Sequence, residues 1–161
     1  MDIQFKLFET QINPVYQVAE IEIHYKTKVN PSERPHISSS RASYDILLSI
    51  WDSNAIEYKE EFKILLLNQS NKVLGAVNVS KGGVSSTVVD AKIVFGAALK
   101  ANASFIILAH NHPSGNLTPS EPDKRLTQKL KQAGEFLDLK ILDHIILTKE
   151  GYYSFADEGS L

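Results

Sequence analysis

Two histidines and an aspartate that could bind a metal lie near one another in the sequence, at His110, His112 and Asp123. The apolar run 105–109 directly precedes them and predicts a strand buried on both faces. Side chains at positions i and i+2 of an extended chain point to the same side, so the two imidazoles can reach one ion. A catalytic zinc takes three protein ligands and leaves a fourth position for water. The spacing therefore predicts one Zn²⁺ per chain, bound by His110, His112 and Asp123.

Each of these features also has an ordinary structural explanation. Ser120 and Asp123 form the pattern Ser-x-x-Asp before an apolar-periodic run, which is close to a capping box with Ser120 as N-cap. An aspartate near a helix N-terminus is favourable in its own right. Two histidines at the end of a strand are compatible with surface positions. The combination of all these features, in this order after a buried strand, favours the metal site.

The order of the motifs resembles that of a known superfamily. The motif His-Asn-His-Pro at 110–113, then Ser-Glu-Pro-Asp at 120–123, resembles the JAMM (MPN-plus) metalloprotease motif. Three motifs resemble the RadC branch of that superfamily. They are His-Asn-His-Pro-Ser-Gly-Asn at 110–116, Leu-Asp-His-Ile-Ile at 142–146 and Tyr-Ser-Phe at 153–155. The resemblance covers about residues 40–161. It implies an MPN/JAB1-like fold of cytidine-deaminase-like architecture and a zinc-dependent hydrolase acting on a peptide or isopeptide bond.

The resemblance also implies roles for two catalytic residues. Ser120 matches the serine whose hydroxyl helps to stabilise the oxyanion, and one oxygen cannot readily serve as both N-cap and oxyanion donor. Zinc lowers the pKa of its bound water from about 15.7 to about 7, and a nearby carboxylate can then accept a proton from that water. The JAMM pattern has this glutamate at the head of an upstream strand.

Two adjacent glutamates, Glu60 and Glu61, compete for the role of general base. Counting back from Asn68, as in RadC-like chains, indicates Glu60, whereas counting as in other JAMM proteins indicates Glu61. Neighbouring residues of a strand face opposite ways, so only one of them can serve. We favour Glu60, and both being solvated charges at a strand start is the alternative.

Two further positions bear on the site. RadC-like proteins carry the pair Asp143-His144, and His144 could support a metal ligand from behind. A lone histidine in an apolar strand is more often a core residue with its hydrogen bonds satisfied, and we favour that interpretation. Asp90 stands where many RadC-like chains have glutamate, so we expect no catalytic role for it.

Composition limits the class of protein. The chain of 161 residues predicts one main domain, and a net charge of −2 implies no strong attraction to nucleic acid. There is no cysteine, which excludes disulfides, thiolate zinc ligands and a thiol nucleophile. We recognise neither a membrane span nor a signal peptide and predict a cytoplasmic protein without a membrane partner.

The periodicity of the chain predicts a mixed α/β sheet flanked by helices. Residues 1–37 form a predicted N-terminal extension, with a strand at Val18–Tyr25 and an extended connector over 26–37. The RadC-like domain is predicted over 38–161. Its predicted elements are a helix over 40–52, a hairpin over 60–79, a helix starting at Thr87-x-x-Asp90, a strand over 104–109, a helix from Ser120, and strands over 139–147 and 152–155.

Three functions remain open from the sequence. The first is a zinc-dependent peptidase or isopeptidase with a peptide or protein substrate. The second is a DNA-repair-associated protein, such as a metallonuclease, although residues 1–37 show no helix-hairpin-helix segment of the kind that longer relatives carry. The third is a non-catalytic MPN scaffold. Neither the substrate nor the oligomeric state is readable from the sequence, and a nucleic-acid partner stays open.

Overall fold

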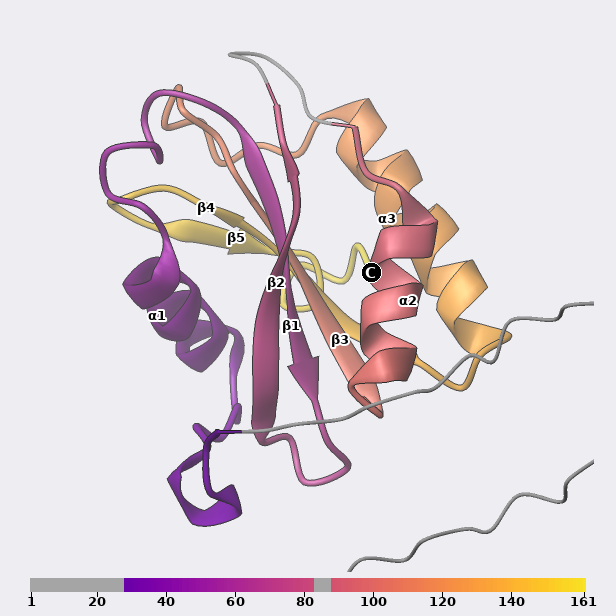
Figure 1. Cartoon of the computed structure of the whole chain (residues 1–161). Helices are drawn as coiled ribbons and strands as arrows, with labels where there is room; N and C mark the ends of the chain where they lie inside the picture. The colour runs from indigo at the N-terminus through magenta and orange to yellow at the C-terminus, as the bar shows by residue number, and fades with distance from the viewer. Residues whose placement is uncertain (1–27, 83–87) are drawn as a thin grey trace, which may run out of the picture.

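The computed structural model describes residues 28–82 and 88–161 and arranges them around one five-stranded sheet (Figure 1). Its strands lie in the order β2-β1-β3-β4-β5. The parallel pair is β3 and β4, and the other three neighbouring pairs are antiparallel. The predicted mixed sheet is therefore confirmed. The strands are β1 (Glu61–Leu67), β2 (Val73–Lys81), β3 (Phe105–Asn111), β4 (Lys140–Leu147) and β5 (Tyr152–Ser154).

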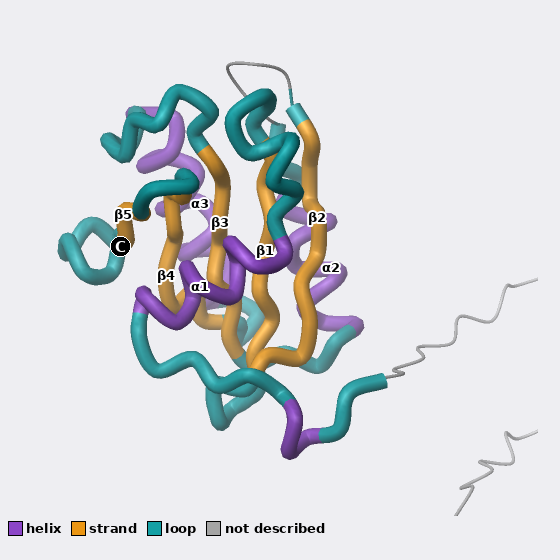
Figure 2. Tube along the Cα trace, turned by 90° about the vertical axis from the view of Figure 1, so that its left-hand side faces the viewer, coloured by secondary structure: helices purple, strands orange, loops and turns teal. Residues whose placement is uncertain are grey.

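Helices cover both faces of this sheet. Helix α1 (Ser40–Ile50) lies on one face, and α2 (Ala91–Lys100) and α3 (Glu121–Glu135) lie on the other (Figures 1 and 2). Because side chains alternate along a strand, β1 contributes to both layers of the core. Its Ile64 packs in the cluster beneath α2 and α3, and its neighbour Leu65 packs in the cluster beneath α1.

The central part of the fold brings one strand end and one helix start together. Strand β3 lies in the middle of the sheet between β1 and β4, and the chain crosses from β3 through α3 to the parallel strand β4. The N-terminus of α3 therefore follows the carboxyl end of β3 after a short loop, residues 112–120. In open α/β sheets the carboxyl ends of strands are the usual place for a ligand site.

Several predicted element boundaries shift. The predicted start of a helix at Thr87 is wrong, because α2 begins at Ala91 and the Asp90 side chain caps it by accepting from the Lys92 N–H. Thr87 itself lies outside the described residues. An aspartate is as good an N-cap as a threonine, and the sequence offers both within one turn.

The N-terminal extension is described only in part. The predicted strand Val18–Tyr25 lies outside the described residues. The connector is not extended throughout, since a 3-10 helix, η1, occupies Pro31–Glu33. After it, His36 forms an isolated bridge with Lys72. A proline at the first helical position favours this short turn.

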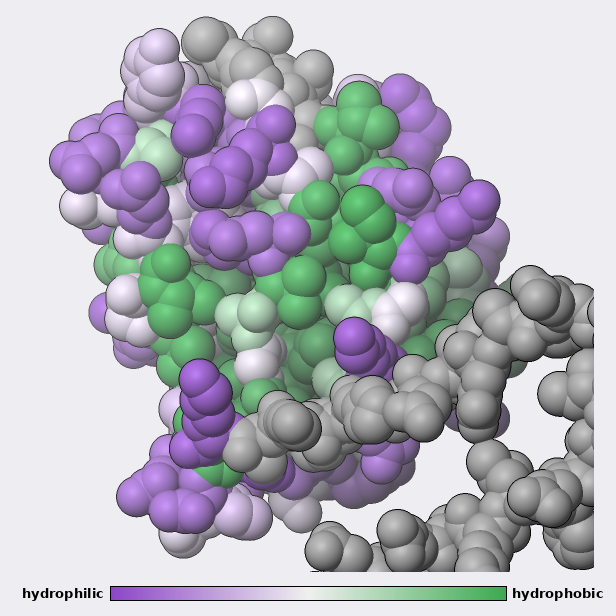
Figure 3. All heavy atoms as spheres, viewed as in Figure 1, coloured by the Kyte–Doolittle hydropathy of each residue, from purple (hydrophilic) through white to green (hydrophobic). Residues whose placement is uncertain are grey.

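Trp51, the one tryptophan of the chain, is buried in the cluster beneath α1. Hydrophobic residues gather in the middle of the face seen in Figure 3, which is viewed from the β2 edge of the sheet. Helix α2 also carries two exposed large hydrophobic side chains, Ile93 and Leu99. Among residues 28–82 and 88–161, none of the helices has the length and apolar character that crossing a membrane requires.

Candidate metal centre

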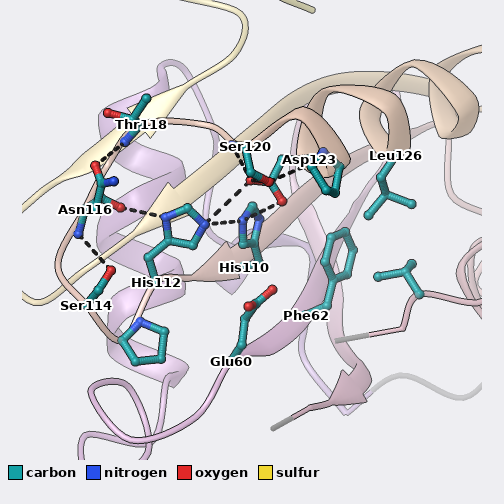
Figure 4. Close-up of a pocket in the computed structure, with 13 residues that line it drawn as sticks. Glu60, Phe62, His110, His112, Ser114, Asn116, Thr118, Ser120, Asp123 and Leu126 are labelled. Carbon is teal, nitrogen blue, oxygen red and sulfur yellow. Dashed lines mark hydrogen bonds and ion pairs between the residues drawn. The ribbon is translucent and has the colours of Figure 1, made fainter. Parts of the chain in front are cut away.

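Three potential metal ligands meet where β3 ends and α3 begins (Figure 4). The Nε2 atom of His110 lies 3.0 Å from the Nε2 atom of His112 and 3.3 Å from Oδ1 of Asp123. The His112 Nε2 atom lies 3.7 Å from Oδ2 of Asp123. One ligand atom from each residue falls within 4.8 Å of the others, and no other such group of three occurs among the described residues.

The donor set fits a zinc ion. Two ligands that each lie about 2.0–2.1 Å from zinc at a tetrahedral angle are about 3.3 Å apart, close to the separations seen here. Two imidazole nitrogens and one carboxylate oxygen also match catalytic zinc sites, which keep one position open. The same donors suit other divalent metals, including Fe(II). The geometry therefore supports a site for one divalent metal ion.

A tight loop orients His112. Its Nδ1 atom lies 2.6 Å from the carbonyl oxygen of Asn116, so the Nδ1–H donates and Nε2 keeps its lone pair for a metal. The loop folds back at Gly115, which has φ +78° and donates its N–H to the His112 carbonyl. A glycine suits this left-handed conformation because it has no Cβ. The nearby carboxylate of Asp123 raises the pKa of His112, against the opposing effect of burial.

His110 sits at the end of β3 and is 1% exposed. Its Nδ1 atom lies 2.8 Å from Nε2 of His144 on β4, and its ring stacks on Phe62 with centroids 6.1 Å apart. His144 is fully buried, as expected of a core histidine, and it also contacts a potential metal ligand. His144 therefore has features of both interpretations drawn from the sequence, since it is a buried core histidine and also hydrogen-bonds to a potential metal ligand.

Asp123 is held by the cap of α3. Ser120 is the N-cap, and its N–H and hydroxyl both donate to Asp123 Oδ2, at 2.7 and 2.6 Å. The Asp123 N–H in turn donates to Ser120 Oγ. Burial acts to raise the pKa of Asp123, but the contacts of its carboxylate with His110, His112 and Ser120 outweigh that effect and hold the pKa well below its usual range. Asp123 is therefore ionised, as a metal ligand must be.

The two adjacent glutamates lie in different surroundings. Glu60 lines the cavity that contains the three potential ligands (Figure 4). Burial raises the pKa of Glu60, although His110 and His112 partly oppose this effect. Glu61 is 1% exposed and pairs with Lys63 at 3.0 Å, and both belong to strand positions that face away from Phe62.

The cavity has a volume of about 440 Å³ and two kinds of wall. Polar groups surround the potential metal site, including Glu60 and Ser120. Phe62 and Leu126 form an apolar wall beside them (Figure 4). A cleft that combines apolar walls with a few converging polar groups is the usual form of a small-molecule or peptide site.

Sequence reasoning missed three residues that support this centre. They are Asn116, which accepts from His112, Thr127, which contacts His144, and Asn111, which lies between the two histidines. The Asn111 side chain accepts the Glu61 N–H and donates to the carbonyls of Ile56 and Lys59, so it ties the segment that carries Glu60 to β3. Because side chains alternate along a strand, Asn111 points to the face opposite the two histidines, and a polar residue at such a position indicates a role on that face.

Comparisons with known proteins find similar sequences over most of the chain. The sequence model of the RadC-like JAB domain matches residues 37–160. A UPF0758 protein of Flavobacterium johnsoniae is 56% identical over 100 residues, which are 62% of this chain and 44% of the relative. The UPF0758 protein YfjY of Escherichia coli K12 is 46% identical over 103 residues, 64% of each chain. A UPF0758 protein of Symbiobacterium thermophilum is 34% identical over 144 residues, 89% of this chain and 60% of the relative. The chain spans about half the length of most of the curated relatives it matches.

Proposed function

Because the chain belongs to the family of RadC-like JAB domains, we propose that it is a zinc-dependent hydrolase that cleaves a peptide or isopeptide bond. The observation that carries the proposal is the convergence of His110, His112 and Asp123 on one point of a cavity that Glu60 also lines. A zinc ion bound there supplies Lewis acidity, which acidifies water and polarises a carbonyl. The family supports a hydrolase, and the bond cleaved is part of the proposal.

Glu60 and Ser120, two polar residues that line the cavity, each have a proposed catalytic role. Glu60 accepts the proton of the attacking water and delivers it to the leaving amine, for which a pKa raised by burial is suited. Ser120 donates its hydroxyl to the developing oxyanion, which requires the O–H to turn away from Asp123 Oδ2. Before that step, the same hydroxyl holds Asp123 in place as a ligand.

The first test is elemental metal analysis of purified protein, with wild type beside Asp123→Ala. We expect about one zinc per wild-type chain and loss of the metal in the variant, because three ligands are needed for tight binding. Thermal melting of both metal-free proteins serves as the folding control. One equivalent of iron instead of zinc would revise the metal, and no metal after zinc addition would contradict the hydrolase and favour the scaffold.

The substrate needs a separate test. Zinc-loaded protein is incubated with a proteome-derived peptide mixture, and new termini are identified by mass spectrometry. Cleavage that disappears in Asp123→Ala supports the peptidase. Binding or cleavage of DNA with a steep salt dependence would support the nuclease instead. The cytoplasmic location and the boundary between residues 37 and 38 stay predictions.

A further inference from the structure

A buried chain of hydrogen bonds connects two of the potential metal ligands behind the cavity. The Nδ1 atom of His110 lies 2.8 Å from Nε2 of His144, and Nδ1 of His144 lies 2.6 Å from the Thr127 hydroxyl. The Thr127 hydroxyl lies 2.7 Å from the carbonyl oxygen of Asp123. The chain therefore starts at one ligand, passes through β4 and α3, and ends at the backbone of another.

The directions of these hydrogen bonds follow from the last member of the chain and from the burial of His144. A carbonyl oxygen can only accept, so the Thr127 hydroxyl donates to Asp123. The Thr127 oxygen is then the acceptor for His144, which must carry a hydrogen on Nδ1. Because His144 is fully buried, the neutral ring is favoured, and its Nε2 is left with a lone pair. That lone pair accepts the Nδ1–H of His110.

His110 thereby presents an unprotonated Nε2 to the metal site. We propose that His144 and Thr127 are positioning residues that fix the tautomer of His110 and so set the metal affinity of the site. The proposal rests on the proposed metal-dependent function. Ligating histidines commonly donate their second ring N–H to an acceptor, and loss of that acceptor typically weakens metal binding by roughly 10- to 100-fold. Here the acceptor is a second histidine, whose own tautomer Thr127 determines.

Packing against aromatic side chains restricts the orientation of the His144 ring. It stacks on Phe155 with centroids 4.9 Å apart, and Phe62 meets it edge-on at 5.6 Å. Thr127 is completely buried, and it lies four residues after Asp123, one helical turn along the same face of α3. The helix that supplies one ligand therefore also supplies the group that orients the histidine behind another.

The test uses two substitutions of Thr127. Thr127→Val keeps the branched shape and removes the hydroxyl, and Thr127→Ser keeps the hydroxyl and removes a methyl group. Zinc affinity of the full chain is measured by competition with a chromophoric chelator. We expect about tenfold weaker binding in Thr127→Val and near wild-type binding in Thr127→Ser. Equal affinity of all three proteins, or weakening only in Thr127→Ser, would overturn the proposal.

A second readout does not depend on metal. Long-range ¹H–¹⁵N NMR spectra of metal-free wild type report which ring nitrogen of His144 carries the hydrogen. We expect the hydrogen on Nδ1 in wild type and Thr127→Ser, with redistribution to Nε2 in Thr127→Val. A hydrogen on Nε2 of His144 in wild type would overturn the chain of donors. If wild type has the expected tautomer but binds no zinc, the metal-dependent function fails and the positioning role fails with it.

Discussion

Glu60 and Glu61 are neighbours in the sequence, yet one faces the cavity and the other faces a lysine. Glu61 is buried against Lys63, whose ammonium also contacts Asn78 and lies 4.6 Å from the centre of the Trp51 ring. The Lys63 ammonium offsets the charge of the buried Glu61, whose side chain points away from the metal site. The general-base role proposed for Glu60 therefore has a natural internal control one residue away.

We predict that Glu60→Gln retains zinc and loses hydrolysis by roughly 10²- to 10⁴-fold, because the amide cannot accept the proton. The measurement pairs metal content with the rate of cleavage of a peptide substrate found in the mass-spectrometric screen. Glu61→Gln is the matched control. It should lower the free energy of unfolding by on the order of 3 kcal/mol, since it removes the charge paired with buried Lys63. Undiminished hydrolysis by Glu60→Gln would contradict the role proposed for Glu60.

At the scale of single elements, α3 is anchored at both ends. Its first turn is capped by Ser120 and supplies Asp123. Near its last turn the Gly134 carbonyl accepts the N–H groups of Leu137 and Leu139, and the chain turns back through Asp138 with φ +53°. A Cβ at Gly134 would lie 2.3 Å from the Leu139 carbonyl oxygen. Strand β4 can therefore start directly beside the end of α3.

We predict that Gly134→Ala lowers the free energy of unfolding by roughly 3 kcal/mol, because the contact is with backbone that cannot move aside cheaply. Gly96→Ala provides the opposite case. Gly96 lies in the middle of α2, and a Cβ added there would meet nothing within 4 Å. At that position, alanine should raise the free energy of unfolding by about 1 kcal/mol through helix propensity. Urea unfolding of both variants checks the pair, and equal effects would contradict the close approach at Gly134.

At the scale of the whole molecule, the metal site joins elements that are distant in sequence. The potential ligands come from β3, the loop after it and α3, and the residues that orient them come from β4 and α3. The unfolded chain cannot hold these groups together. Metal binding should therefore be linked to folding of the sheet with α3.

We predict that zinc stabilises the folded chain against heat and urea. At a free zinc concentration one hundred times the dissociation constant, the gain is about 2.7 kcal/mol. Differential scanning fluorimetry with zinc and then with excess chelator should show a reversible rise and fall of Tm. Asp123→Ala is the control and should show no rise. An equal rise in that variant would mean that zinc binds elsewhere.

The sequence by itself determined much of the fold and the types of residue that could bind a metal. Local patterns carry this information, because the apolar run of β1, the capping residues of α3 and the spacing of His110 and His112 depend on neighbours within a few residues. The start of α2 could not be read from local pattern in the same way, since Thr87 and Asp90 are both N-cap residue types and the structure shows that Asp90 caps the helix. The count back from Asn68 favoured Glu60, which lines the cavity, but the tertiary structure alone decided which residues hydrogen-bond to the histidines from behind the cavity. Those contacts join Thr127 to His144 and Asn111 to Glu61, and they depend on strand register and on the placement of α3 against the sheet. No spacing along the chain encodes such distances, because they arise from the packing of whole elements.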